Sequence, residues 1–394
     1  MHTRRLARAA EAASARRRPG PWLAALVLTA LAGTVLPWAT RAASASSWRR
    51  IDTPHFTVIG SVGERELGDV AAQFERFREV LAQLLPPQAT APVVPTVVIA
   101  FGSDKDFDPF KPVYRGKPIE TAGLFVPSAD LNYIAVVAGS RGFRTVFHEY
   151  AHLVTANLRL SIPVWLNEGV AEYYSTFELL RGGRNANIGQ PITSHVLLLR
   201  DEWLKLDALL AVQPDSPLYN EGDRRSVFYA QSWALVHYLL HGTPPRRDWL
   251  VKYMSAIEAG TSEGEAWNHI FGTQPVEAGL RDYVHRSQFQ MVEVTLAERV
   301  ETRAAAVGAL SDDDAEAFLG DFVARQKRQD EVPARLELAA ERPDGARARG
   351  ALARLRARQN RPAEARALLA RTQAATGDWL ADYAVGVAAA ETFA

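Results

Sequence analysis

Two histidines four residues apart, inside a segment with helical periodicity, constrain the fold of this chain more than any other feature. Residues 148–152 read His-Glu-Tyr-Ala-His, and apolar residues recur at helical spacing over 143–158. Four residues advance a helix by about 400°, so both imidazoles project from one face, one turn apart. Two nitrogens placed in this way can reach one ion at about 2.0 to 2.1 Å. The pattern predicts a helix that supplies His148 and His152 to a metal site.

Glu149 follows the first of these histidines and lies about 100° around the helix from it. Its carboxylate does not stack beside the histidines as a ligand, but it can reach a water molecule bound to the metal. A carboxylate in that place suits a general base in metal-assisted hydrolysis, so Glu149 is predicted to be catalytic. Two satisfied core histidines, or a purely structural metal, are the alternatives. A structural zinc is normally closed by four protein ligands.

A third ligand is expected from residues 163–174, which read Pro-Val-Trp-Leu-Asn-Glu-Gly-Val-Ala-Glu-Tyr-Tyr. Pro163 opens a second predicted helix that runs to about Leu180. A short connection between the two helices could bring Glu168 to the ion and leave the fourth position open, as a catalytic site requires. The chain has no cysteine, so thiolate ligands are excluded.

The paired motifs resemble those of the gluzincin metallopeptidases, whose third ligand is the glutamate of an Asn-Glu pair. In particular, Trp-Leu-Asn-Glu-Gly is similar to the signature of aminopeptidase N-like enzymes and of bacterial peptidase MA-like domains, over about residues 48–240. The resemblance implies an α+β fold with a zincin-like catalytic domain, made of a small mixed sheet plus active-site helices. It also implies Zn²⁺ held by His148, His152 and Glu168, and peptide-bond hydrolysis. The motif spacing is shorter than in the aminopeptidases and their Gly-x-Met-Glu-Asn motif is absent, so aminopeptidase specificity does not carry over.

Glu172 lies one turn after Glu168, on the same face of the second helix. Thermolysin-like gluzincins place an aspartate at this offset to accept a hydrogen bond from a ligand histidine, so Glu172 is expected to orient His148. A solvated surface glutamate is one alternative. Direct ligation by Glu172 in place of Glu168 is another.

Amide hydrolysis also needs a hydrogen-bond donor for the oxyanion of the tetrahedral intermediate. Tyr229 lies in a downstream helical segment where related enzymes place a tyrosine or histidine for this task, and His237 is the second candidate. A core tyrosine is the alternative for Tyr229. The substrate is expected to be held as an extra strand along residues 131–137, because extended peptides pair with exposed sheet edges. The sequence does not show which strand is the edge.

The rest of the chain divides into a sheet-forming part, a helical part and a C-terminal region. Residues 48–140 predict the order β-α-β-β, and residues 141–299 are predicted to be mainly helical, so that 46–299 forms one metallopeptidase domain. Beyond about residue 300 the composition turns to Ala, Arg and Glu, which predicts an all-α region over 300–394. The predicted strands are 56–60, 95–101, 124–126 and 131–137, with a helix over 64–85.

One unit of the C-terminal region resembles a tetratricopeptide repeat. Ala353, Ala365 and Leu369 fall where such a repeat keeps its small and packing residues, and residues 360–365 fit the turn into its second helix. An Ala-rich helical hairpin is the alternative. A lone repeat cannot bury its own face, so it is expected to pack on the catalytic domain, on less regular neighbours or on a protein partner.

Residues 1–45 are predicted to be a secretory signal peptide. They combine an arginine-rich start, an apolar stretch over 22–36 and the small residues Ala43-Ser44-Ala45. We therefore expect an exported protein, periplasmic or extracellular, whose mature chain begins at Ser46. An uncleaved membrane anchor formed by residues 22–37 is the alternative, and an intact mass that retains Met1 on membrane-bound protein would favour it.

Charge and composition limit the classes of partner. The 47% hydrophobic and 23% charged content is typical of a globular protein. Without the first 45 residues the chain has 38 basic and 44 acidic side chains, which argues against nucleic acid as a partner. The expected partner is a peptide or protein substrate. Two other functions stay open: hydrolysis of a non-peptide amide, and a non-catalytic exported binding protein that retains a gluzincin-like fold.

Overall fold

The computed structural model describes most of the chain that follows the predicted signal peptide, which itself lies outside the described residues. Residues 45–394 form one compact unit. None of the helices that the structure describes is long and apolar enough to cross a membrane. The described ranges are 47–91, 94–114, 117–139, 142–158, 160–220, 225–244, 246–297, 306–326, 334–343, 345–372 and 377–393.

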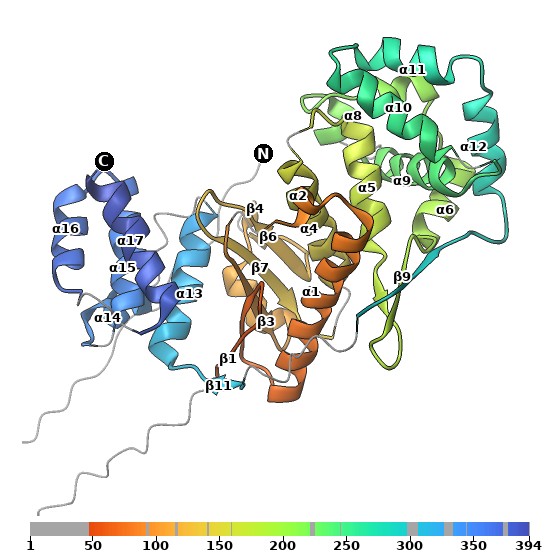
Figure 1. Ribbon diagram of the computed structural model, residues 1–394. Coiled ribbons are helices and arrows are strands. Elements are labelled where there is room, and N and C mark those ends of the chain that lie inside the picture. The colour runs from red at the N-terminus through yellow and green to blue at the C-terminus, as the bar shows by residue number, and fades with distance from the viewer. Residues whose placement is uncertain are drawn as a thin grey trace, which may run out of the picture. The chain divides into compact units, whose positions relative to one another are not determined.

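A mixed six-stranded sheet, ordered β11-β1-β2-β3-β7-β6, organises this unit (Figure 1). The inner pairs β2/β3 and β3/β7 are parallel, whereas β1/β2, β1/β11 and β6/β7 are antiparallel. The four predicted strands and the predicted helix are present as β2, β3, β6, β7 and α1, and the predicted pairing of the last two strands is antiparallel, whereas β1 was not predicted. The strands are β1 (Arg49–Asp52), β2 (Thr57–Gly60), β3 (Thr96–Phe101), β6 (Gly123–Val126), β7 (Asn132–Val137) and β11 (Gly308–Ala309).

Helices cover both faces of the sheet, which explains why its inner strands read as continuous apolar runs. Val98 of β3 and Val136 of β7 pack into the same core as helices α1 (Glu64–Leu84) and α4 (Gly142–Asn157). Their neighbours Val97 and Val137 point to the other face and pack with α13 (Asp312–Arg325) and α17 (Trp379–Phe393). This alternation follows from the two-residue repeat of a strand.

Strand β7 has neighbours on both sides, β3 and β6. The expectation that a substrate pairs with residues 131–137 is therefore wrong, because the backbone groups of that strand are already hydrogen-bonded within the sheet. In the sheet as the structure describes it, β6 is the outermost strand on this side.

The helix predicted from Pro163 to Leu180 is shorter than expected. It is α5 (Val164–Ser175), and the chain turns at Thr176, whose hydroxyl accepts the backbone N–H groups of Gly189 and Gln190. The chain then enters a small antiparallel sheet that the sequence did not reveal, since its strands are short and one partner lies about a hundred residues away. These strands are β8 (Glu178–Leu179), β9 (Asn185–Ile188) and β10 (Val292–Thr295).

Helix α9 (Arg225–His241) is the centre of the helical part, because α5, α6, α10 and α12 all contact it. Trp233 of α9 is fully buried there, in agreement with the aromatic-rich sequence of this region. The neighbouring helices are α6 (Thr193–Asp201), α7 (Leu206–Leu210), α8 (Pro217–Asn220), α10 (Arg247–Glu258), α11 (Glu263–Phe271) and α12 (Val276–Val284). Shorter elements are α2 (Pro87–Thr90), α3 (Asp104–Phe107), η1 (Asp108–Phe110), β4 (Val113–Tyr114) and β5 (Lys117–Pro118).

The C-terminal region is helical, as predicted. Besides α13 and α17 it contains α14 (Ala334–Glu341), α15 (Ala346–Arg358) and α16 (Pro362–Ala370). Ala353 and Ala365 are fully buried against Ala388, where α15, α16 and α17 meet. The packing is that of a helical hairpin with a third helix, and its membership of the tetratricopeptide class stays a prediction.

A network of ion pairs ties the C-terminal helices to the turn between β6 and β7. Asp130 in that turn contacts Arg325 at 2.9 Å and Arg354 at 2.6 Å. Arg325 also contacts Asp321, which accepts a hydrogen bond from Tyr133 of β7. Residues on both sides of the predicted boundary at 300 therefore share one buried polar network.

Candidate metal centre

Helices α4 and α5 pack against each other and bring three side chains to one point. The Nε2 atoms of His148 and His152 lie 3.1 Å apart, and the Oε2 atom of Glu168 lies 3.2 Å from the first and 3.3 Å from the second. Glu168 is 2% exposed. The structure thus brings together the three residues that the sequence predicted as ligands, and these residues could hold a metal ion.

The size of this triangle can be compared with that of a zinc site. Donor atoms at about 2.0 to 2.1 Å from a tetrahedral ion lie about 3.3 to 3.4 Å from one another, close to the observed separations. Glu168 Oε2 is buried and lacks a hydrogen-bond partner within the described part of the chain. A buried carboxylate oxygen without a partner is costly, and a cation would satisfy it. The donor set of two nitrogens and one oxygen therefore fits the expected ion.

Two carboxylates surround His148. Its Nδ1 atom lies 3.4 Å from Glu172 Oε1, on the side opposite Glu168. Burial lowers the pKa of His148, but the interactions with Glu168 and Glu172 outweigh this effect and raise the pKa to about 10. Burial raises the pKa of Glu168, but the two histidines have the larger combined effect and lower it to about 2. Two ionised carboxylates in a poorly solvated place favour the binding of a cation.

Glu172 does not join the triangle of donor atoms, so the geometry favours Glu168 over Glu172 as a ligand. Glu172 is held instead by Arg144, whose Nη2 lies 2.7 Å from its Oε2, and by His195, whose Nε2 lies 3.3 Å away. Burial raises the pKa of Glu172, but its partners His148 and His195 hold that pKa far below its ordinary value. An ionised Glu172 can fix the ring orientation of His148.

Arg144 and His195 are additions to the site that sequence reasoning missed. Arg144 precedes His148 by one helical turn, so its spacing could have revealed it. His195 is near the start of α6, in a segment with no motif. Tyr219 of α8, which donates a hydrogen bond to Glu168 Oε1 at 2.7 Å, was missed for the same reason.

The Asn-Glu-Gly sequence has a local explanation. Asn167 accepts a hydrogen bond from Thr155 of α4 at 3.1 Å, which fixes how α5 lies against α4. A Cβ atom at Gly169 would collide with the backbone carbonyl of Ser232 in α9. Glycine therefore allows α9 to approach α5 closely, and α9 carries Tyr229.

Glu149 and Tyr229 both line an open cleft of about 590 Å³ beside His148. The rings of Tyr229 and His148 are 6.1 Å apart. Arg144, Glu172 and His195 line the same cleft. The predicted base and the predicted oxyanion donor thus face the same space, next to the candidate metal ligands.

His237, the second candidate for the oxyanion donor, is not placed for that task. It is fully buried, its Nδ1 is bonded to the hydroxyl of Tyr283 at 2.7 Å, and its Nε2 to the carbonyl of Gly189 at 2.8 Å. Burial lowers its pKa to about 4. The proposal of His237 as a donor is wrong because both nitrogens are used within the core.

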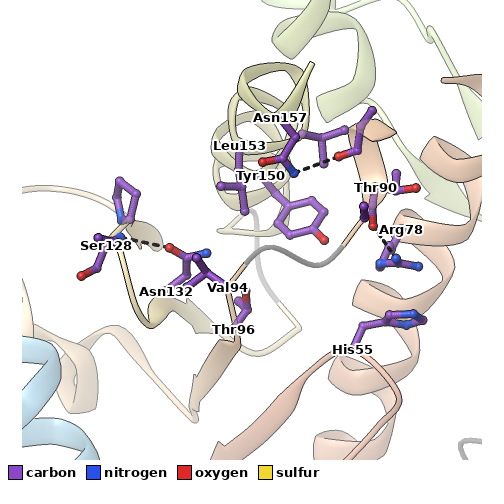
Figure 2. A pocket seen from close by; sticks show the side chains of 15 residues that line it. His55, Arg78, Thr90, Val94, Thr96, Ser128, Asn132, Tyr150, Leu153 and Asn157 are labelled. Carbon is purple, nitrogen blue, oxygen red and sulfur yellow. Dashed lines mark hydrogen bonds between the residues drawn. The ribbon is translucent and has the colours of Figure 1, made fainter. Parts of the chain in front are cut away.

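A second cavity, of about 320 Å³, lies against α4 and contains none of the candidate ligands (Figure 2). Tyr150 and Leu153 of α4 line it, together with His55 and Arg78. Its polar groups are partly engaged with the backbone: Asn157 donates to the carbonyl of Ala89 and Arg78 donates to that of Thr90.

Comparison with protein families agrees with the geometry. The model of the Peptidase MA superfamily matches residues 121–286, from the start of the β6 region to just past α12. The match supports a peptidase MA-like domain that contains all of the site residues described above, and members of this superfamily are typically metal-dependent. Comparison with curated proteins gives no match.

Proposed function

We propose that this protein is a zinc-dependent metallopeptidase that hydrolyses peptide bonds, with His148, His152 and Glu168 as ligands. The observation that carries the proposal is the triangle of donor atoms on α4 and α5, with Glu149 lining the adjacent cleft. The match of residues 121–286 to the Peptidase MA superfamily supports the same reaction class.

Each residue of the cleft has a task in this reaction. A bound zinc ion would polarise the substrate carbonyl and acidify a water molecule. Glu149 takes a proton from the attacking water and delivers it to the leaving nitrogen. Tyr229 donates a hydrogen bond to the oxyanion, and Glu172 keeps the ring of His148 in place.

The substrate is proposed to be an extended peptide or protein segment. Strand β6 replaces β7 as the strand along which such a segment can add, because β6 is outermost in the described sheet. The C-terminal helices are proposed to recruit a protein partner, and the mature protein is proposed to be exported. Hydrolysis of a non-peptide amide would use the same groups.

Substitution of Glu149 by Gln tests the proposal. Glutamine keeps the size of the side chain but cannot accept the proton, so bound zinc should stay at one ion per chain. Cleavage of a peptide library should fall by about 10²- to 10⁴-fold, or about 3 to 5 kcal/mol in transition-state stabilisation. The measurement compares wild type and Glu149→Gln at equal zinc content.

Glu66→Gln, an equivalent change at an exposed position of α1, serves as the control and should cleave like wild type. Equal cleavage by wild type and Glu149→Gln would mean that another base or a contaminant is responsible. Absence of cleavage by zinc-loaded wild type across a broad library would favour the non-catalytic binding protein.

A further inference from the structure

We propose that Tyr219 is a positioning residue of the metal centre, which holds Glu168 as a one-oxygen ligand and connects it to Tyr229. This inference rests on the proposed metal site. It adds a residue from α8 to a centre that otherwise consists of residues from α4, α5, α6 and α9.

The two oxygens of Glu168 have different surroundings. Oε1 accepts a hydrogen bond from the Tyr219 hydroxyl at 2.7 Å. Oε2 faces the Nε2 atoms of His148 and His152 and has no hydrogen-bond partner among the described residues. Because Oε1 is engaged by Tyr219, Oε2 is the oxygen that remains to bind the ion.

Aromatic packing fixes the position of the Tyr219 hydroxyl. Its ring stacks on Tyr229 with centroids 6.2 Å apart and planes 20° apart, and it meets Phe228 edge-on at 5.8 Å. A chain of contacts thus runs from the carboxylate ligand through Tyr219 to the candidate oxyanion donor.

The bond from Tyr219 restrains the carboxylate of Glu168. A phenol hydroxyl that donates to Oε1 opposes rotation of the carboxylate that would bring both oxygens to the ion. Rotation of that kind would occupy the coordination position that a catalytic site keeps open for water or substrate.

Substitution of Tyr219 by Phe removes the hydroxyl and keeps the ring that packs on Tyr229 and Phe228. Outer-shell partners of metal ligands are typically worth about 10- to 100-fold in metal affinity. Zinc affinity of the full chain, measured by competition with a chelator, should fall by about that factor. The visible absorption spectrum of the cobalt(II)-substituted protein should also change, because it reports the number and geometry of ligands.

Tyr229→Phe is the matched control, since it removes the neighbouring hydroxyl without removing the bond to Glu168. Its cobalt spectrum and zinc affinity should stay close to wild type, while turnover falls. The metal-free forms of both variants should unfold at nearly the same temperature as wild type. A parallel loss of stability and affinity in Tyr219→Phe would instead mean a merely structural role and would overturn the inference.

The outcomes separate this inference from the proposed function. A zinc-binding wild type with an unchanged spectrum and affinity in Tyr219→Phe would refute the role of Tyr219 and leave the peptidase proposal standing. A wild type that binds neither zinc nor cobalt would remove both. The expected change in spectrum and affinity supports Tyr219 without any reference to peptidase activity.

Discussion

At the scale of single residues, the proposed metal site depends on which carboxylate faces both histidines. Glu168 and Glu172 lie one turn apart on α5, yet only Glu168 reaches the Nε2 atoms of both histidines. Glu172 approaches His148 on its other nitrogen and is held by Arg144 and His195. The two glutamates therefore have separable effects on metal binding.

Substituting either glutamate by Ala should distinguish these effects. Glu168→Ala removes one of three protein ligands, so zinc should no longer be retained at one ion per chain after dialysis. Glu172→Ala keeps the three ligands and should weaken zinc binding by about 10- to 100-fold. Elemental analysis and chelator competition provide the measurements, and full zinc retention in Glu168→Ala would transfer the ligand role to another residue.

At the scale of elements, the site depends on how closely α9 approaches α5. Gly169 allows this approach, because any larger residue would meet the backbone of α9 at Ser232. The same contact sets the position of Tyr229 relative to His148 on α4. Helix packing and cleft geometry are thus linked through one glycine.

Gly169→Ala should therefore destabilise the protein by about 1 to 3 kcal/mol, as expected for overpacking between close helices. Gly68→Ala is the matched control: it also lies within a helix, but its added methyl group meets no atom within 4 Å. Because alanine loses less backbone entropy than glycine on folding, that variant should be about 0.5 to 1 kcal/mol more stable than wild type. Urea denaturation of both variants measures the difference, and equal stabilities would contradict the close-contact argument.

Some helices and strands could be predicted from the sequence and others could not, for physical reasons. Helix α4 could be predicted because its motif and its apolar period agree over sixteen residues. The end of α5 could not be predicted, because it depends on a contact with a later segment. The hydroxyl of Thr176 accepts the backbone N–H groups of Gly189 and Gln190. Strand β11 has two residues and a partner far away in sequence, β1, so no local pattern marks it.

Site residues followed the same rule. His148, Glu149 and His152 could be placed on one helix from their spacing, whereas the choice of Glu168 as the third ligand also depended on the resemblance of its motif to the gluzincins. Tyr219 and His195 come from separate segments, α8 and α6, and only the folded chain brings them to the site. His237 shares a helix with Tyr229, but its side chain is buried in the core. Spacing along the sequence does not reveal this difference.

At the scale of the whole molecule, the sheet separates two sets of helices with different contacts. One face carries α1 and α4 with the candidate metal centre, whereas the other is covered by α13 and α17. Asp130 joins the two sets, since Arg325 and Arg354 both bind it. Burial raises the pKa of Asp130, but the arginines lower it to about 2, so this junction stays ionised over most of the acid range.

Global stability should decrease in mild acid because of two buried histidines of α9. Burial lowers the folded-state pKa of His237 and of His241 to about 4, whereas an unfolded histidine titrates near 6.5. The unfolded chain therefore binds protons first, and the stabilisation present above about pH 6.5 is lost progressively as the pH falls towards 4. Between pH 7 and pH 5 the free energy of unfolding should drop by about 2 to 4 kcal/mol.

Urea denaturation of the metal-free protein at pH 7 and pH 5 measures this drop. His237→Asn should make it smaller, because one of the two titrating groups is absent. His269→Gln, a change at an exposed histidine, should leave it as in wild type. An unchanged drop in His237→Asn would assign the acid sensitivity to other groups.

The triangle formed by His148, His152 and Glu168 also indicates which ions the proposed site would accept. Calcium prefers six to eight oxygen donors at about 2.3 to 2.6 Å, and magnesium prefers an octahedron of oxygens that includes several waters. A set of two imidazole nitrogens and one carboxylate oxygen has the wrong donor atoms for both ions. The proposed site would therefore favour small, nitrogen-preferring ions over calcium and magnesium.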